Sequence, residues 1–132
     1  MINKDEMMIP ILEVCPSFRA ERDAFVDEWK DEKDGLPLYL SLSSLARHLI
    51  SMLEVGKTEA FLEIFKIVER WNTEGDEYVR EAATVGLLED LQNTNLHEKT
   101  DPEQFRSYLG TESLKWWDKL YGFWERGEML RP

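Results

Sequence analysis

The sequence is poor in the residues on which enzymatic chemistry usually depends. It has one cysteine, Cys15, and two histidines, His48 and His97, among 132 residues. One thiol cannot form an internal disulfide and supplies no zinc ligand set, so we expect a reducing compartment. No glycine-rich phosphate loop precedes a helix, and no Glu-x-x-His pairs indicate a di-metal site. We therefore predict no catalytic residue, no metal and no cofactor, and an enzymatic role is the weaker interpretation.

Basic residues are outnumbered as well. The chain has 16 Lys and Arg against 27 Asp and Glu, a net charge of −11 and an isoelectric point near 4.6. This balance is opposite to that of nucleic-acid-binding proteins and suits a basic protein partner. An acidic surface can also serve only to keep a protein soluble. The composition thus argues against nucleic acid as a partner without by itself requiring a basic one.

Long apolar segments are absent too. No run approaches the roughly 18 apolar residues that a membrane-spanning helix needs. Residues 1–14 are too acidic and too poor in apolar side chains for a signal peptide. We therefore expect a cytoplasmic protein that does not enter a membrane.

What the sequence does contain is helical periodicity. Apolar residues recur every three or four positions from Phe18 to Trp29, from Leu38 to Leu53 and from Phe61 to Trp71. No two-residue hairpin turn accompanies them, and the longest alternating run is only the LYLSL of residues 38–42. These patterns predict helices rather than strands.

Residues typical of helix ends lie next to these predicted helices. Gly56 should end the helix that begins near Leu38. Asp101 should cap a short helix that Gly110 ends, and Thr111 should begin the last helix of the chain. The short loops between these elements favour a single packed domain.

The segment Gly75–Asn93, GDEYVREAATVGLLEDLQN, combines small and apolar residues. Ala82, Ala83 and Gly86 would let a neighbouring helix approach closely, and the apolar residues around them cover most of the helix. We expect this helix to be central, with Asp76 at its start. The stretch DEYVREAATVGLLEDL resembles the second helix of a HEAT-type repeat. Because no other segment repeats it, the resemblance implies HEAT-like packing and not a long solenoid.

We therefore predict an all-α protein in which residues 1–132 form one domain. It should be a compact stack of about five to seven helices with HEAT-like antiparallel packing. Residues 1–15 should form an N-terminal arm or short helix, and residues 16–126 the helical core.

Several short motifs are spread over the chain from about Pro16 to Trp124. They are Pro16-Ser17-Phe18, Leu45-Ala46-Arg47-His48-Leu49, the Gly75–Asn93 segment, Leu109-Gly110 with Glu112-Ser113, and Trp116-Trp117. Together they resemble a family of small bacterial proteins with no established activity. The resemblance implies a bacterial, cytoplasmic origin and brings no mechanism with it.

The end of the central helix is the first candidate binding site. Glu89 and Asp90 lie in its last turns, where the helix dipole disfavours negative charge by about 0.3–1 kcal/mol per residue. An internal cation such as Arg47, Arg106 or Lys115, or solvent alone, could offset them. Alternatively, Glu89, Asp90, Gln92 and Asn93 present acceptors and amides to a basic partner.

The last helix is the second candidate. Its aromatic residues fall on two adjoining faces: Trp116 and Phe123, with Leu120 between them, lie on one face, and Trp117, Tyr121 and Trp124 lie on the other. Either the stack buries both faces or part of the second face is an interface, for which Trp116 and Trp124 would be suitable anchors.

Two further groups of polar residues remain open. The stretch from Glu21 to Asp34 holds seven acids and three bases, and Asp27 and Asp31 could contact a basic partner or simply be solvated. His48, beside Arg47 in an apolar helix, is either a satisfied histidine or a member of a polar cluster with Glu69.

These observations support three hypotheses. The leading one is a non-enzymatic, acidic helical module that binds a basic protein partner, for example an immunity-type protein that neutralises a basic toxin. The second is a homo-oligomeric structural protein that associates through its Trp-rich helix. The third is a small enzyme that uses a pocket of Arg47, His48 and carboxylates such as Glu69.

Overall fold

Seven α-helices and four further helical segments make up the part of the chain, residues 1–126, that the computed structural model describes. The α-helices are α1 (Ile9–Val14), α2 (Arg19–Trp29), α3 (Leu38–Glu54), α4 (Phe61–Glu74), α5 (Glu77–Glu81), α6 (Glu89–Leu91) and α7 (Thr111–Arg126). The segments η1 (Pro16–Phe18), η3 (Thr94–Leu96) and η4 (Pro102–Tyr108) are 3-10 helices, and η2 (Ala82–Leu88) is π-helical. The prediction of an all-α fold is confirmed. None of the described helices has the length and apolar character needed to cross a membrane.

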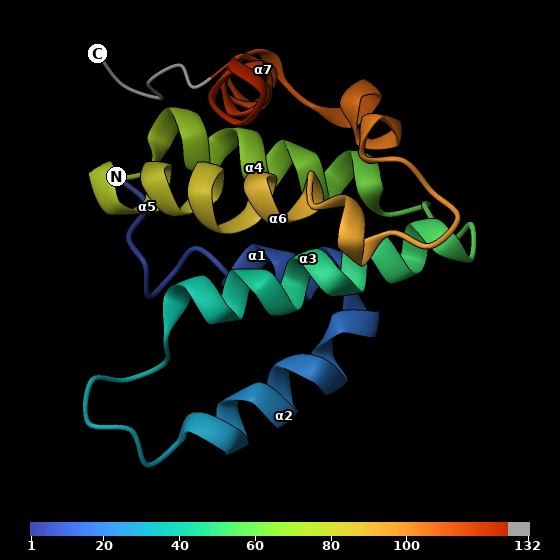
Figure 1. Cartoon of the computed structure of the whole chain (residues 1–132). Coiled ribbons are helices and arrows are strands. Elements are labelled where there is room, and N and C mark those ends of the chain that lie inside the picture. The colour runs from blue at the N-terminus through green and yellow to red at the C-terminus, as the bar shows by residue number, and fades with distance from the viewer. Residues whose placement is uncertain (127–132) are drawn as a thin grey trace.

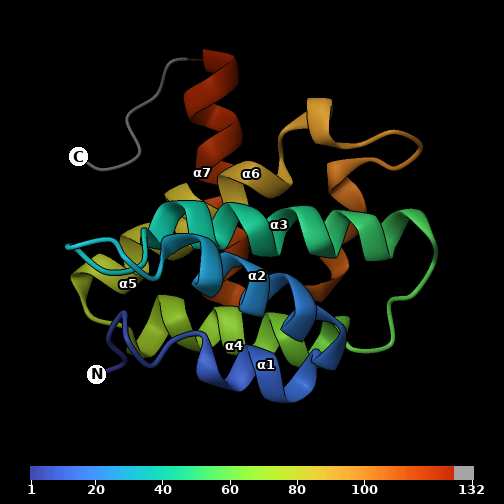
Figure 2. The same cartoon turned by 90° about the horizontal axis from the view of Figure 1, so that it is seen from below.

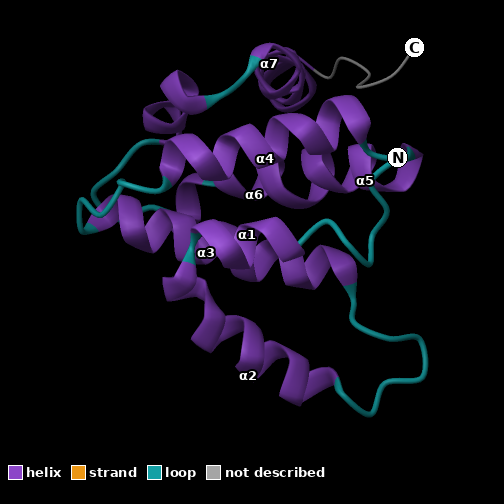
Figure 3. Ribbon diagram, turned by 180° about the vertical axis from the view of Figure 1, so that it is seen from behind, coloured by secondary structure: helices purple, strands orange, loops and turns teal. Residues whose placement is uncertain are grey.

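The helices are stacked in successive layers (Figure 1). Helix α7 and segment η4 lie at one end, above α4 and the helix that runs from α5 through η2 to α6. The next layer contains α1 and α3, and α2 lies outermost at the other end, where only its Phe25 is buried (Figures 1 and 3). The α2 side and the α7 side of the molecule are thus separated by the whole core.

The core forms where apolar stripes of consecutive helices face one another. Leu42, Leu45 and Leu49 of α3 are fully buried, as are Ile64 and Val68 of α4. Their spacing of three or four residues places each set on one helix face, as the sequence predicts. Gly56, with a φ of 75°, follows α3 and permits the turn toward α4.

The central helix runs without a break through α5, η2 and α6. Asp76 caps it by accepting a hydrogen bond from the Val79 amide at 2.9 Å. All residues of η2 except Val85 are buried, and a Cβ added to Gly86 would lie 2.8 Å from Leu42 Cδ1. The prediction of a central helix approached closely by a neighbour is confirmed, and that neighbour is α3.

Helix α7 is fixed to the core at its first turn by a carboxylate from another helix. Glu69 of α4 accepts hydrogen bonds from the backbone amides of Glu112 (2.9 Å) and Ser113 (2.8 Å) and from Ser113 Oγ (2.8 Å). Gly110 makes room for it, because an added Cβ would lie 2.5 Å from Glu69 Cδ. The short helix that Gly110 is predicted to end, η4, ends at Tyr108, two residues earlier, and the φ of Gly110 is not positive. Asp101 caps η4 as predicted.

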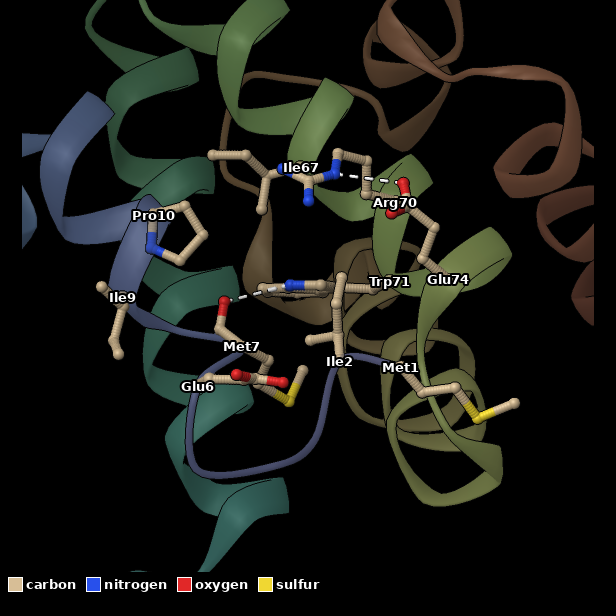
Figure 4. A pocket seen from close by; sticks show the side chains of 10 residues that line it. All are labelled: Met1, Ile2, Glu6, Met7, Ile9, Pro10, Ile67, Arg70, Trp71 and Glu74. Carbon is tan, nitrogen blue, oxygen red and sulfur yellow. Dashed lines mark hydrogen bonds and ion pairs between the residues drawn. The ribbon is translucent and has the colours of Figure 1, made fainter.

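The N-terminal residues pack against α4 (Figure 4). Met7 and Ile11 are fully buried, and the Trp71 indole N–H donates to the Met7 carbonyl oxygen at 3.0 Å. Ile2 pairs with the backbone beside Gly75. Residues 1–15 thus contain the short helix α1 and contribute to the same core as residues 16–126.

Candidate functional site: an acidic groove beside α7

A groove runs along α7 in two sections that share side chains. The first section, of about 480 Å³, is lined by Glu89, Asp90, Gln92, Asn93, Thr94, Tyr121, Trp124 and Glu125. The second, of about 400 Å³, is lined by Gln92, Thr94, Asp101, Pro102, Glu103, Arg106, Tyr121 and Glu125. Four residues line both sections, so we treat the two as one feature, the acidic groove.

Two elements create the first section. Helix α6 and the turn after it supply Glu89 to Thr94, and the last turns of α7 supply Tyr121 and Trp124. The C-terminal end of α7 projects beyond the layer of α3 and α6 (Figure 2). The groove therefore combines the predicted residues Glu89, Asp90, Gln92, Asn93 and Trp124, although Asn93 and Trp124 are 31 positions apart in the chain.

Glu89 and Asp90 are half-buried and poorly compensated. Burial raises the pKa of Glu89, and the neighbouring charge of Asp90 raises it further. Burial also raises the pKa of Asp90, although a hydrogen bond from Ser43 and the charge of Arg47 act in the opposite direction. Since both lie at a helix C-terminal end, the dipole disfavours their charge as well. Ionising this pair costs free energy that the fold does not recover in full.

Of the three internal cations considered for this pair, only Arg47 acts on it. Arg106 instead binds Glu103 at 2.7 Å and Asp118 at 2.8 Å, and Lys115 lies 3.5 Å from Glu112. The charge of Arg47 lowers the pKa of Asp90 only in part. The first section therefore remains strongly acidic.

Gln92 is the buried polar residue of the groove. Its side-chain nitrogen donates to the Trp117 carbonyl oxygen at 2.9 Å, and the residue is 8% exposed. The oxygen of the same amide is buried and has no hydrogen-bond partner among the described residues. Buried acceptors are rarely left without a donor, so this oxygen is an unsatisfied acceptor within the wall of the groove.

The aromatic residues of α7 divide between the core and the groove. Trp117 and Leu120 are fully buried, while Trp124 is 60% exposed and packs edge-on against Phe123. Trp116 does not line the groove; its indole N–H donates to Glu112 at 3.2 Å, and the Lys119 ammonium lies 4.8 Å from its ring centroid. Of the two predicted anchors, only Trp124 belongs to the site.

Asn93 and Glu103 have structural tasks within the groove. The Asn93 side chain caps η3 by accepting from the Asn95 amide at 3.0 Å. Burial raises the pKa of Glu103, but hydrogen bonds from Arg106, Trp117 and Tyr121 outweigh that effect and leave the pKa below its usual value. The second section thus contains a carboxylate, Glu103, whose negative charge is already stabilised by partners within the protein, unlike the charges of Glu89 and Asp90.

Asp27 and Asp31 are not part of this site. Asp27 lies on α2 and pairs with Lys30 at 3.2 Å, with both side chains largely exposed, and Asp31 follows the end of that helix. Helix α2 lies on the opposite side of the molecule from α7 (Figure 1). They form a separate, solvated acidic surface.

The predicted cluster of Arg47, His48 and Glu69 is not formed, because Glu69 caps α7. His48 instead lies 2.9 Å from Ser17 Oγ through Nε2 and 3.7 Å from Glu21 through Nδ1. Burial lowers the pKa of His48, and the charge of Glu21 partly offsets this. Ser17, in η1, and Glu21, in the first turn of α2, are four residues apart, a spacing that could have identified them as a pair facing His48.

The His48 contacts join α2 to α3. A hollow of about 280 Å³ lies beside them, lined by Glu21, Ser44, Arg47, His48 and Ser51. The 3.7 Å separation of Glu21 from Nδ1 exceeds a hydrogen bond, so the carboxylate does not orient the ring as a catalytic triad requires. The arrangement is that of a structural histidine. Within residues 1–126, no three His, Cys, Asp or Glu side chains are grouped so that they could hold a metal ion.

A further hollow, of about 620 Å³, lies between the N-terminal residues and α4 (Figure 4). Its polar side chains bond within the protein: Arg70 pairs with Glu74 at 3.2 Å, and Glu6 accepts from the Asn3 amide at 2.9 Å. The Trp71 indole is also engaged, with the Met7 carbonyl oxygen. This hollow therefore presents a largely apolar wall, whereas the first section of the acidic groove presents carboxylates whose charge is only partly compensated.

Comparison with known proteins adds a family and no activity. Residues 8–125 match the family described as "Domain of unknown function (DUF7674)", so the chain belongs to that family. The match confirms the expectation of a family without assigned function. Neither the curated proteins nor the solved structures contain a significant match to this chain.

Proposed function

We propose that this protein is a non-enzymatic interaction module that binds a basic segment of a protein partner in the acidic groove. The observation that carries the proposal is the half-buried pair Glu89–Asp90, whose pKa values are both raised, beside the exposed ring of Trp124. Carboxylates placed for stability normally have partners that lower their pKa. Here the compensating cation is best supplied by a ligand.

A bound cation would relieve the two effects that make this pair unfavourable. It would attract both carboxylates in a half-buried environment, where charge interactions are stronger than in bulk water. It would also offset the repulsion between Glu89 and Asp90 and the effect of the helix dipole. Part of the binding free energy would thus come from relieving the unfavourable ionisation of Glu89 and Asp90 in the unbound protein.

The net charge of −11 supports the same proposal at longer range. An acidic protein attracts a basic partner before contact and accelerates its capture. An immunity-type protein that neutralises a basic toxin in the bacterial cytoplasm is a concrete instance. The buried position of the single thiol, Cys15, is compatible with that compartment.

The test is a binding measurement with the full chain and a labelled peptide of alternating glycines and basic residues. We expect saturable binding that weakens as the salt concentration rises. The double variant Glu89→Gln/Asp90→Asn should lose most of this affinity. The charge-matched control Asp27→Asn/Asp31→Asn, on α2, should keep it. No binding, binding that is indifferent to salt, or equal losses in both variants would contradict the proposal.

Self-association through α7 is the competing proposal. It is favoured by the adjacent exposed residues Phe123 and Trp124, which are 40% and 60% exposed. Light scattering at high protein concentration separates the two proposals. A monomer leaves the groove available to a partner, and a dimer that dissociates in Trp124→Ala would replace the groove proposal.

A further inference from the structure

We propose that the first section of the groove is an arginine-selective subsite, in which a guanidinium group of the partner lies between Glu89, Asp90 and the ring of Trp124. This inference rests on the proposed function and names the side chain that the site recognises. Lysine-rich and arginine-rich segments are both basic, so the function alone does not choose between them.

The lining of the first section matches the hydrogen-bonding pattern of a guanidinium. That group is planar and carries five N–H donors and no acceptor. The section offers carboxylate oxygens from Glu89 and Asp90, and its wall contains the buried, unpartnered amide oxygen of Gln92; all of these atoms are acceptors. Gln92 is more than nine-tenths buried and its nitrogen is held by Trp117, so the amide is fixed with its oxygen unused. This acceptor is independent of the acidic pair.

The exposed indole favours arginine over lysine. A guanidinium stacks on an aromatic face and is less strongly hydrated than an ammonium group. Entering a half-buried site therefore costs arginine less, and the flat ring of Trp124 gives it a second surface to contact. Lysine would place a compact, strongly hydrated charge in the same position and use at most three donors.

The second section shows where the guanidinium cannot go. There the protein's own Arg106 already binds Glu103 and Asp118, and Tyr121 donates to Glu103 at 3.1 Å. An intramolecular arginine thus occupies the carboxylates at one end of the groove. The partner's arginine fits the other end, where no arginine of residues 1–126 forms a salt bridge with Glu89 or Asp90 and Arg47 offsets the charge of Asp90 only in part.

The test uses three labelled peptides of equal length that carry arginine, lysine or neutral citrulline at the same positions between glycines. Affinity for the full chain is measured by fluorescence anisotropy. We expect the arginine peptide to bind about tenfold more tightly than the lysine peptide, and the citrulline peptide not to bind.

Two variants test whether the preference for arginine over lysine depends on the Trp124 ring. Trp124→Leu should reduce the arginine-to-lysine ratio toward one, because the stacking surface is lost. The matched control Trp116→Leu, at a tryptophan outside the groove, should leave the ratio unchanged. Circular dichroism confirms that both variants are folded. Asp90→Asn should weaken both peptides.

The outcomes separate this inference from the proposed function. Equal binding of the arginine and lysine peptides, both lost in Glu89→Gln/Asp90→Asn, overturns arginine selectivity and leaves the function standing. A ratio that survives Trp124→Leu also overturns the inference. Failure of every basic peptide to bind overturns the proposed function itself.

Discussion

The two ends of α7 meet carboxylates in opposite ways. At its first turn, Glu69 accepts three hydrogen bonds from Glu112 and Ser113. Burial raises the pKa of Glu69, but these hydrogen bonds outweigh it and the pKa falls below its usual value. Near its last turns, Glu89 and Asp90 are half-buried as well, and their pKa values are raised. Similar burial thus gives opposite shifts, and the hydrogen-bond partners decide the direction.

The same division extends to other acidic residues. Glu54 accepts from the Thr100 hydroxyl and from the amides of Glu98 and Lys99, and its pKa is lowered chiefly by the Thr100 hydrogen bond. It holds the loop before η4 against the end of α3. The carboxylates of Glu54 and Glu69, with lowered pKa values, each accept several hydrogen bonds from a second element, whereas Asp90 accepts one, from Ser43 of α3. The direction of the pKa shift thus follows the number of hydrogen bonds that each carboxylate accepts.

The largest effect is expected at the structural end. Glu69→Ala should lower the free energy of unfolding by about 2–3 kcal/mol, because two backbone amides and a hydroxyl lose a charged acceptor. The folded-state pKa is lowered, so this contribution is present above the unfolded-state pKa and is lost as the pH falls through the folded-state value. Denaturant unfolding at neutral pH measures it.

The control for this prediction is Glu63→Ala on the same helix. Glu63 is exposed, and its one ion pair among residues 1–126 is with Lys66 at 3.3 Å, so its removal should change stability by less than about 0.5 kcal/mol. Equal effects at the two positions would remove the distinction between structural and solvated acids on α4.

Gly110→Ala tests the same contact from its other side. The added methyl group would overlap the Glu69 carboxyl, so we expect a loss of about 1–2 kcal/mol in unfolding free energy. In a Glu69→Ala background the obstruction is absent, and the same substitution should cost less than about 0.5 kcal/mol. Additive effects in this double-mutant cycle would show that the lack of a side chain at Gly110 is not what makes room for the Glu69 carboxyl group.

Local patterns in the sequence predicted the helices well, because they depend on neighbouring residues. The stripe from Leu38 to Leu53 and the caps Asp76 and Asp101 each concern one helix, and the structure confirms all three. The cap of α7 was not predictable in this way. It comes from Glu69, more than forty residues earlier, while the nearest residue, Gly110, has no side chain with which to cap.

The sequence predicted the acidic part and the aromatic part of the candidate site separately, but not that they lie together. The unfavourable position of Glu89 and Asp90 follows from the helix dipole, and the surplus of aromatic residues on α7 follows from counting helix faces. That Trp124 joins this pair and Trp116 does not depends on how α7 is rotated against α6, which no local pattern specifies. Likewise, His48 faces Ser17 and Glu21 because α2 crosses α3, and Glu69 was assigned to it wrongly.

Removing a carboxylate charge near the last turns of α7 should stabilise the protein, whereas removing Glu69 at the first turn destabilises it. Glu89→Gln should raise the free energy of unfolding by about 0.3–1 kcal/mol at neutral pH, since it removes a disfavoured charge from a helix C-terminal end. The folded-state pKa is raised, so the stabilising contribution is present below the unfolded-state pKa and is lost as the pH rises through the folded-state value. The advantage of the variant should therefore vanish in acid.

Asp27→Asn, on the exposed surface of α2, is the charge-matched control for this change and should shift stability by less than about 0.5 kcal/mol. If Glu89→Gln destabilised the free protein, Glu89 would be a structural acid like Glu69. A variant that is more stable yet binds basic peptides less well would instead show that the groove retains its charge for a ligand.

The smallest effect is expected at His48, where α2 joins α3. Burial lowers its folded-state pKa, so its stabilising contribution is present above the unfolded-state value of about 6.5 and is lost as the pH falls through the folded-state pKa. His48→Gln, which keeps a polar group toward Ser17, should flatten the change in stability between neutral and mildly acidic pH. Glu21→Gln should steepen it, because the charge that favours protonation is removed. An unchanged pH profile in both variants would mean that protonation of His48 is not coupled to the packing of α2, and that only the carboxylates make stability depend on pH.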